Sequence, residues 1–291
     1  MEIPETQLET WSHQGAVTTA KATHESIRKA LDSYEWPNSV NSEVYLQGSY
    51  KNDTNIRGDM DVDVVVQLNS SFYSNLCNLS EEQKRSLGFT PASYEWSAFR
   101  SDVLKALEDY YGSGTISEGN KSIKIKAAAG RLPADVVVCA QYRKYRSLNS
   151  HDYVKGMTFW TRNEYRQVIN YPKLHYENGV IKHQNTNGWY KKTARMFKNI
   201  RNYLEENYYF PDNLAPSYFL ECFLYDVPNR NFGGNFGDTF CNVVTWLVGA
   251  KFDDFVCQNE QLPLFGNTPE QWSIGSANEL MQKLIKLWND W

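Results

Sequence analysis

Cysteine and histidine are scarce in this chain of 291 residues, and neither forms a pattern. The five cysteines are scattered and odd in number, without C-x-x-C spacing, and the five histidines lack the spacing of metal ligands. These absences exclude a disulfide framework and a zinc site. We therefore predict reduced, mostly buried thiols at the cysteine positions, which are Cys77, Cys139, Cys222, Cys241 and Cys257.

Long apolar runs are absent as well. No stretch reaches the roughly twenty apolar residues of a membrane span, no signal-peptide pattern is found, and there is no internal repeat. We therefore expect a cytoplasmic protein with no membrane partner. The chain also lacks an excess of positive charge, because 30 Lys and Arg residues stand against 34 Asp and Glu residues, a net charge of −4. This balance argues against a long nucleic-acid template, which would normally require a basic domain.

Two aspartates introduce a valine-rich segment, and a Gly-Ser pair precedes them. The pair is Gly48-Ser49, and Asp61-Val62-Asp63 follows it after a short polar linker. The valines at 64–66 indicate a β-strand, in which Asp61 and Asp63 would point the same way, about 7 Å apart at their Cα atoms. Two neighbouring carboxylates repel each other, and a bound Mg²⁺ or Mn²⁺ ion would remove that cost.

A third aspartate opens another short apolar run. Asp135 stands near the start of the segment 132–139, which is rich in valine. If this segment forms a strand beside the first, Asp135 completes a three-carboxylate cluster with Asp61 and Asp63. Such a cluster can hold two metal ions, which stabilise the attacking and the leaving oxygen in phosphoryl transfer. The alternative is that all three are strand-end aspartates exposed to water.

Hydrophobic periodicity divides the chain into two parts. Residues 1–157 mix helical patterns with short strand-like runs, in an order that favours a mixed sheet over a regular βαβ repeat. Residues 158–291 change to helices and aromatic-rich loops, and this change begins after about Gly156. We predict helices at 14–34, 93–111, 189–207, 216–225 and 276–291, strands at 115–117, 122–126 and 132–139, a hairpin turn at 114–122 and a glycine-rich loop at 231–240.

The pattern of Gly48-Ser49 followed by Asp61-Val62-Asp63 resembles the nucleotidyltransferase superfamily of DNA polymerase β. The resemblance implies that the Gly-Ser pair opens a short helix whose N–H groups meet a nucleotide triphosphate, with Ser49 at the β- and γ-phosphates. Lys51 and Arg57 either add charge there or are solvated. The expected fold is α+β: a polymerase β-like core of mixed β-sheet and helices plus a helical second lobe, with the active site in the cleft between them.

Further segments narrow the resemblance to the bacterial cGAS/DncV-like nucleotidyltransferases (CD-NTases), in the branch of cyclic GMP-AMP synthase and oligoadenylate synthase. By this resemblance Lys198 and Ser217 grip the triphosphate and Tyr218 stacks on the base. The alternative is a solvated lysine, an N-cap serine and a core tyrosine. Arg195 and Arg201 are further candidates for the same pocket. The segments that carry the resemblance are 48–63, with Thr54 and Arg57-Gly58-Asp59, and 169–175, 190–201 and 216–221.

The resemblance also implies an activity. Residues 1–157 would be the catalytic core with an N-terminal helix, and 158–291 the nucleotide-binding lobe. The enzyme would join ATP and a second NTP into a cyclic di- or trinucleotide with release of pyrophosphate, using two Mg²⁺ ions (or Mn²⁺) per active site. As a monomer in bacterial anti-phage (CBASS) signalling, it would reach a separate cyclic-nucleotide-activated effector through its product. Base preference, linkage and ring size stay open.

Two other functions compete with this one. The chain could be a transferase on the same fold with another acceptor, making linear oligoadenylate or modifying RNA, a small molecule or a protein. An RNA-tailing enzyme should carry an extended basic groove, and the net charge of −4 argues against one. The other is a catalytically dead nucleotide-binding or scaffold protein, which has no chemical reason to keep all three acids. Because no Cys/His cluster exists, the zinc-binding insertion of the animal enzyme is absent, which argues against DNA sensing.

Overall fold

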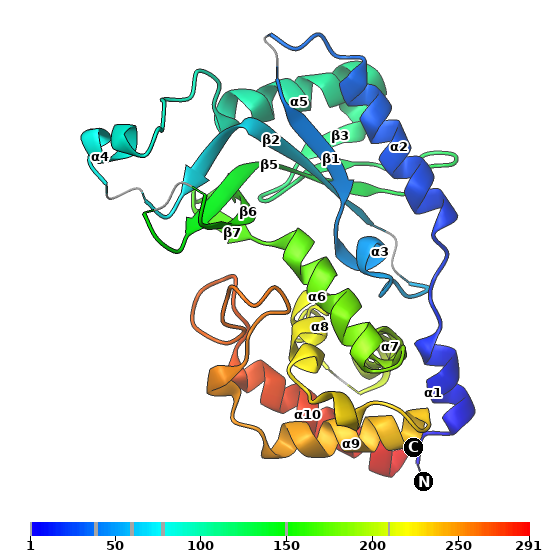
Figure 1. Cartoon of the computed structure of the whole chain (residues 1–291). Helices are drawn as coiled ribbons and strands as arrows, with labels where there is room; N and C mark the ends of the chain where they lie inside the picture. The colour runs from blue at the N-terminus through cyan, green and yellow to red at the C-terminus, as the bar shows by residue number, and fades with distance from the viewer. Residues whose placement is uncertain (1, 38–39, 59–60, 77–78, 149–150, 209) are drawn as a thin grey trace. The chain divides into compact units, whose positions relative to one another are not determined.

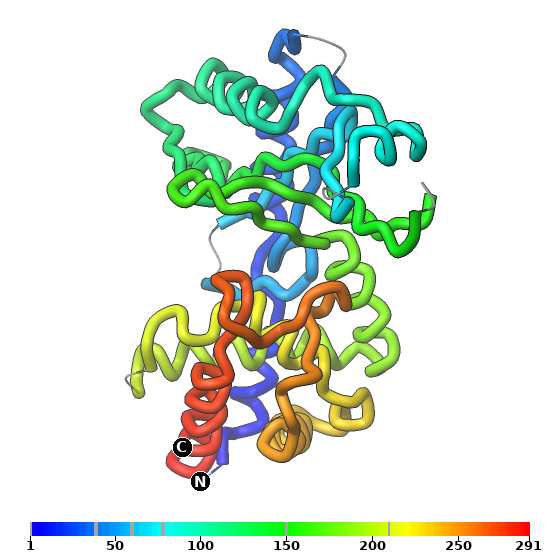
Figure 2. The backbone as a smooth tube through the Cα atoms, turned by 90° about the vertical axis from the view of Figure 1, so that its left-hand side faces the viewer, coloured from blue at the N-terminus to red at the C-terminus, as the bar shows by residue number. Residues whose placement is uncertain are grey.

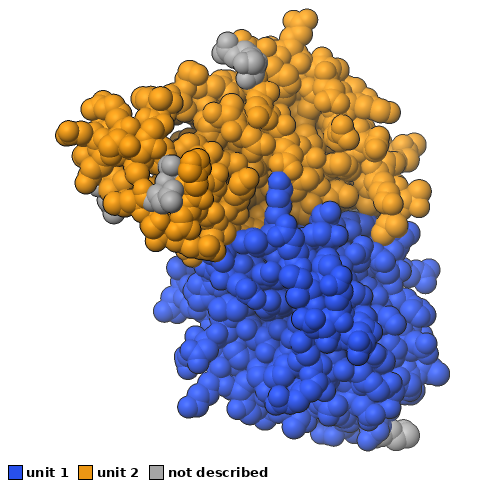
Figure 3. Space-filling view, in the orientation of Figure 1, with its two compact units in different colours: residues 1–16, 48–59, 173–291 blue, residues 17–47, 60–172 orange. Residues whose placement is uncertain are grey.

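The computed structural model describes residues 2–37, 40–58, 61–76, 79–148, 151–208 and 210–291 (Figure 1). Asp59 and Cys77, which belong to the patterns above, lie outside these residues. Internal contacts separate the chain into two compact units, which Figure 3 colours differently. The sheet unit consists of Val17–Gln47 and Met60–Pro172, and the helical unit consists of Met1–Ala16, Gly48–Asp59 and Lys173–Trp291.

Within the described residues, the sheet unit contains a mixed sheet of seven strands. The pair of β2 and β5 is parallel, whereas the other described pairs are antiparallel. This arrangement confirms the predicted mixed sheet. The order along the main path is β1 (Ser42–Leu46), β2 (Val62–Ser74), β5 (Ala134–Tyr145), β4 (Ile123–Ile125) and β3 (Ile116–Glu118), while β6 (Tyr153–Trp160) pairs with β5 and with β7 (Gln167–Asn170).

Two helices pack together against β2 (Figure 1). They are α2 (Thr18–Asp32) and α5 (Trp96–Tyr111), and both confirm predicted helices. Their apolar side chains recur at helical spacing and are buried, as Phe99, Val103 and Leu107 are in α5. The short α4 (Glu81–Ser86) lies in the polar segment between β2 and α5 and begins with a capping box.

A long central helix organises the helical unit. This helix, α7 (Trp189–Asn207), was predicted and contacts α1, α8, α9 and α10. Figure 2 shows α1 beside the end of α10, where the rings of Trp11 and Trp291 lie 5.6 Å apart. The other helices of this unit are α1 (Glu5–Ser12), α3 (Gly48–Asn52), α6 (Pro172–Asn185, which begins at the last residue of the sheet unit), α8 (Ser217–Tyr225), α9 (Phe236–Gly249) and α10 (Ile274–Asp290). Short 3₁₀ turns are η1 (Ser113–Thr115) in the sheet unit and η2 (Asn229–Asn231) and η3 (Phe252–Asp254) in the helical unit.

The loop predicted at 231–240 is wrong in its second half, because α9 begins at Phe236. Two side chains satisfy the backbone donors of its first turn. Asn235 accepts from the N–H of Asp238 at 2.7 Å, and Glu5 of α1 accepts from the N–H groups of Phe236 and Gly237 at 2.7 and 2.8 Å. Glu5 lies at the other end of the chain, so the local sequence carries only half of this capping signal.

The change to helices predicted after Gly156 occurs later than expected. Strand β6 continues to Trp160 and β7 follows it. A Cβ atom at Gly156 would lie 2.8 Å from the Tyr171 ring, so only glycine lets β6 pass this close to the chain that leaves β7. The boundary predicted between 157 and 158 falls within β6, and the division into those two domains stays a prediction. The hairpin predicted at 114–122 is confirmed by the antiparallel pair of β3 and β4, but its turn is shorter than predicted and consists of residues 119–122.

The described cysteines are thiols that form no disulfide, as expected at these four positions. Cys139, Cys222 and Cys257 are buried and Cys241 is half-buried. Among the helices that the structure describes, none has the length and apolar character needed to cross a membrane.

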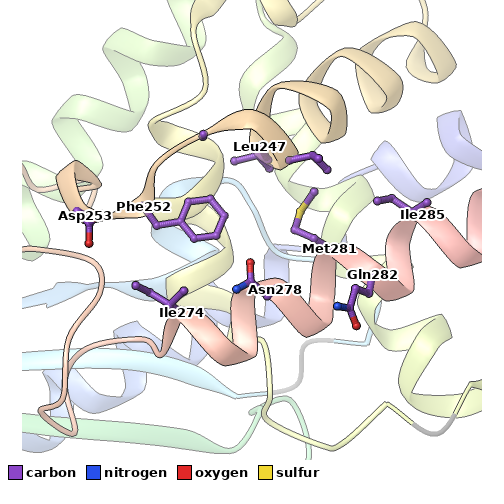
Figure 4. Close-up of a pocket in the computed structure, with 10 residues that line it drawn as sticks. Leu247, Phe252, Asp253, Ile274, Asn278, Met281, Gln282 and Ile285 are labelled. Atoms are coloured by element: carbon purple, nitrogen blue, oxygen red, sulfur yellow. The ribbon is translucent and has the colours of Figure 1, made fainter.

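A surface pocket of about 480 Å³ lies where α10 meets the end of α9 and η3 (Figure 4). Apolar side chains such as Leu247, Phe252 and Met281 form most of its wall, with the amides of Asn278 and Gln282 beside them. The candidate site residues named from the sequence are not part of this wall.

Asp226, which follows α8, is a poorly compensated carboxyl group. Its Oδ1 accepts from the N–H of Val256 at 3.4 Å, whereas its buried Oδ2 has no hydrogen-bond partner among the described residues. Burial raises the pKa of Asp226 to about 7, although the Val256 N–H and Lys182 act against this rise. The folded protein therefore keeps a proton that the unfolded chain releases above about pH 4, so this group lowers stability as the pH rises from about 4 to 7.

We predict that Asp226→Asn raises the melting temperature by several degrees at pH 8 and by clearly less at pH 5, measured by circular dichroism. The amide removes the charge that burial disfavours. Asp253→Asn, at an exposed position of η3, is the matched control and should change the melting temperature little at either pH. An effect of Asp226→Asn that is the same at both pH values would contradict this assignment.

Candidate functional site

The parallel pairing of β2 with β5 brings two of the predicted acids together. Asp63 and Asp135 occupy directly opposite positions in the register. The pairing extends ahead of them through the N–H of Val62, which donates to the carbonyl of Pro133 at 3.0 Å. The valines at 64–66 and 136–138 are buried, as expected for central parallel strands, and the half-buried aspartates stand at the strand starts. The predicted neighbourhood of the two strands is confirmed.

The third predicted acid, Asp61, is exposed and directly precedes β2. Burial raises the pKa of Asp135, the charge of Lys124 opposes this rise, and the charge of Asp61 adds to it. Lys124 lies opposite Asp135 in the register of β4, with its Nζ atom 4.0 Å from Asp135 Oδ1. Asp61 therefore acts on Asp135 as a neighbouring like charge, and Lys124 offsets part of the negative charge.

These acids have the chemistry that a divalent cation requires. Carboxylate oxygens suit Mg²⁺ and Mn²⁺, and like charges on adjacent strands are stabilised by a cation between them. In the part of the chain that the structure describes, no three carboxylate, imidazole or thiol groups already converge on one point that could hold an ion. The donor set fits a divalent ion, while the assignment of Asp61, Asp63 and Asp135 as ligands stays a prediction.

Asp135→Asn tests this metal assignment without an activity measurement. We expect Mg²⁺ to raise the melting temperature of the unmodified protein, because an ion that binds only the folded state stabilises it. In Asp135→Asn this shift should fall to less than half, and the melting temperature in EDTA should not decrease, because the amide removes a charge that burial and the like charge of Asp61 disfavour. Scanning fluorimetry measures both. Asp109→Asn, at an exposed position of α5, is the control, and an undiminished shift in Asp135→Asn would contradict the assignment.

The Gly-Ser pair belongs to the helical unit, where it begins α3 as expected. Gly48 has a φ of 66°, a backbone conformation that glycine adopts without strain. The carbonyl of Ser49 accepts from the N–H of Thr54 at 3.0 Å and closes the turn. Of the two nearby cations, Lys51 places its Nζ atom 4.1 Å from the centre of the Tyr176 ring, and Arg57 is exposed.

Basic side chains of α7 anchor the segment that follows the Gly-Ser pair. Lys191 forms a 2.8 Å ion pair with Asp53, and Arg195 donates to the carbonyls of Asp53 and Ser12. Lys198 is fully buried, so the solvated-lysine alternative is wrong. Its Nζ atom lies 2.5 Å from Glu221 Oε1 and 3.1 Å from the carbonyl of Thr54. Its role as a triphosphate contact stays a prediction.

Glu221 of α8 is a buried carboxylate that the sequence analysis gave no role. Burial by itself would raise the pKa of Glu221, but Lys198 and His175 outweigh burial and hold it well below its usual range. Asn52 and Thr54 donate to its two oxygens. A signal was present in the sequence, because a single carboxylate in the apolar run 218–225 needs a partner.

The start of α8 carries the two remaining candidates. Pro216 is the N-cap and Ser217 is the first helical residue, so the N-cap alternative for Ser217 is wrong. Arg201 donates to the carbonyl of Ala215 at 2.8 Å and to Ser217 Oγ at 3.4 Å, and its place in a triphosphate pocket stays a prediction. The half-buried Tyr218 stacks on the ring of His175, with centroids 5.2 Å apart and planes inclined by 23°.

Comparison with known proteins matches both parts of the chain to families. Residues 26–147 match the nucleotidyltransferase domain, and residues 177–289 match the C-terminal helical domain of cGAS/DncV-like nucleotidyltransferases. The cyclic UMP-AMP synthase of Rhodothermus marinus is 58% identical, over 100% of this chain and 99% of the relative. The cyclic nucleotide synthase CdnE01 of Staphylococcus haemolyticus is 39% identical over 100% of both chains. A solved structure of the R. marinus CdnE c-UMP-AMP synthase with Apcpp and Upnpp has a TM-score of 0.94 at 58% identity, covering 99% of this chain and 97% of that chain.

Proposed function

We propose a function for this chain from one premise: it belongs to the cGAS/DncV-like nucleotidyltransferases. It is therefore a nucleotidyltransferase, and its substrates are NTPs. The proposed reaction joins two NTPs into a cyclic dinucleotide with release of pyrophosphate. The similarity to a cyclic UMP-AMP synthase along the whole chain supports UTP and ATP as the two substrates. The observation that carries the chemistry is the register that sets Asp63 directly beside Asp135.

The reaction consists of two displacements at phosphorus. In the first, a ribose hydroxyl oxygen of one NTP forms a bond with the α-phosphorus of the other, the bond to the β-phosphate oxygen breaks, and pyrophosphate and the hydroxyl proton leave. In the second, a hydroxyl of the linear intermediate attacks the remaining α-phosphorus and closes the ring. Such reactions depend almost entirely on positioning and on neutralising charge.

The acids of the sheet unit would bind the metal ions that neutralise charge at the reacting phosphate. Nucleotidyltransferases generally use divalent metal ions, which supply charge neutralisation at the transferred phosphate. We propose Asp61 and Asp63 as ligands of an ion at the donor triphosphate, and Asp135 as a ligand of a second ion beside the acceptor hydroxyl. The half-buried, register-matched positions of Asp63 and Asp135 support this assignment. Two ions of Mg²⁺, or of Mn²⁺, are our proposal for the cofactor.

Residues of the helical unit would hold the nucleotide. The N–H groups at the start of α3 and the hydroxyl of Ser49 would meet the β- and γ-phosphates, next to the left-handed Gly48. Ser217 opens α8, whose first N–H groups favour an anion, and Arg201 beside it adds positive charge. Lys198 is a further proposed triphosphate contact, and a half-buried Tyr218 would stack on the base.

The proposed product is a signal. A cyclic dinucleotide has no free phosphate end and serves as a soluble messenger, so we propose that it activates a separate effector protein in bacterial anti-phage (CBASS) signalling. The NTP substrates favour action in the cytoplasm. We propose that the enzyme acts as a monomer.

A product assay tests this function. Purified protein is incubated with labelled UTP and ATP, singly and together, with Mg²⁺ or Mn²⁺, followed by phosphatase, chromatography and mass spectrometry. We expect a phosphatase-resistant product that contains one UMP and one AMP and that forms only with both NTPs. Asp61→Ala/Asp63→Ala should reduce its formation at least 1,000-fold, because charge neutralisation is lost. Asp109→Ala is the matched control.

Each other result of this assay identifies an alternative. Linear, phosphatase-sensitive chains would contradict cyclisation and favour an oligoadenylate-type enzyme. A resistant product formed from a single NTP would keep cyclisation and contradict the proposed pair of bases. Absence of product under all conditions would contradict the claim that the two NTPs and a metal ion suffice.

Tyr218 provides a test of base stacking. Tyr218→Ala should raise the KM for NTP about tenfold with a smaller effect on kcat, because an aromatic face contributes about 1–3 kcal/mol per stacked base. Tyr218→Phe keeps the ring and loses only the hydroxyl, which accepts from Asn259 at 3.2 Å, so it should stay within about threefold of the unmodified enzyme. Equal losses in the two variants would contradict stacking as the function of this ring.

A further inference from the structure

One buried carboxylate collects four polar partners in the helical unit. Glu221 Oε1 lies 2.5 Å from Lys198 Nζ and accepts from Thr54 Oγ1 at 2.7 Å. Glu221 Oε2 accepts from Asn52 Nδ2 at 3.3 Å and lies 3.3 Å from His175 Nε2. The five side chains belong to buried residues. Each oxygen of this carboxylate thus has two polar neighbours, and the ammonium group of Lys198 is one of them.

Glu221 and its partners lie on the segments to which we assign nucleotide binding in this unit, and on α6. Asn52 ends α3, the helix that begins with Gly48-Ser49, and Thr54 follows it by two residues. Lys198 lies on α7. His175 lies on α6 and stacks on Tyr218, which is on the same helix as Glu221. One carboxylate therefore connects the residues proposed for the phosphates with the ring proposed for the base.

Stability alone does not account for a buried charge of this kind. Well-packed apolar residues often stabilise a fold as much as a buried ion pair, because taking both charges out of water is costly. What the charged set adds is a defined geometry: each hydrogen bond fixes a direction as well as a distance. Thr54 contributes twice, since its hydroxyl donates to Glu221 and its carbonyl accepts from Lys198.

We infer that Glu221 is a positioning residue for nucleotide binding. Through Asn52 and Thr54 it holds the segment 48–56 in one place relative to α7 and α8, so that the Gly48-Ser49 N–H groups are ready for a triphosphate. Glu221 itself touches no substrate. The inference rests on the proposed function in one respect, which is the assignment of the phosphates to Gly48-Ser49.

Thr54→Val tests this role, because valine keeps the shape of threonine and loses only the hydroxyl. We expect hydrogen–deuterium exchange in residues 48–56 to become faster and the affinity for a non-hydrolysable ATP analogue to fall about tenfold, since hydrogen bonds to charged groups are worth about this factor. The KM for NTP should rise by a similar factor, with kcat within about threefold. Thr54→Ser restores the hydroxyl and should restore all three values.

Thr239→Val is the matched control. Thr239 is another buried threonine of the same unit, and its hydroxyl bonds with the backbone of Gly233. It should lower the melting temperature as much as Thr54→Val does, while leaving nucleotide affinity and exchange in 48–56 unchanged. Asn52→Asp is a second variant of nearly identical shape that puts a like charge beside Glu221, and it should produce the same local effects as Thr54→Val.

The results separate this inference from the proposed function. Unchanged exchange in 48–56 in both Thr54→Val and Asn52→Asp would overturn it. Faster exchange spread evenly over the helical unit would also overturn the inference, because it indicates general destabilisation. If the unmodified protein binds the ATP analogue but makes no cyclic product, the proposed reaction fails while the affinity and exchange comparisons still decide the role of Glu221.

Discussion

The parallel register of β2 against β5 is the constraint on which the chemistry of the sheet unit depends. Both strands are rich in valine and buried, so each needs covered neighbours and takes a central place in the sheet. Their register sets Asp63 opposite Asp135. Because side chains alternate along a strand, a shift by one residue would move one aspartate to the other face and separate the two carboxylates. The apolar packing of the strands thus determines the positions of the acids at their start.

The segment 48–58, which contains the Gly-Ser pair, belongs to a different unit from the strands on either side of it. It joins β1 and β2, both strands of the sheet unit, yet its contacts place it in the helical unit. Polar contacts with Lys191, Arg195 and Lys198 of α7 are among them. The segment that follows the Gly-Ser pair is therefore anchored on α7, in the same unit as the proposed base-stacking ring.

Several features could be predicted because they depend on local spacing. The valine runs identified two strands and the helical spacing identified α7, whereas the short helix at the Gly-Ser pair was expected from the family resemblance. The features that could not be predicted depend on distant partners. Glu5 caps α9 from the far end of the chain, and the late strands β6 and β7 are held by pairing with β5 and with each other. Neither kind of contact leaves a trace in a short window of sequence.

The sequence by itself determined the two kinds of chemistry, acids at the start of apolar strands and a Gly-Ser turn, because residue type and spacing decide which groups can bind a cation or a phosphate. Only the tertiary structure decided which groups meet. In the folded protein Asp63 lies beside Asp135 across parallel strands. Basic side chains of α7 are buried and hold residues 53 and 54, which are far away in the sequence. The physical reason is that charge burial is set by partners: Lys198 is a solvated side chain in an isolated helix and a buried one only because Glu221 and Thr54 meet it.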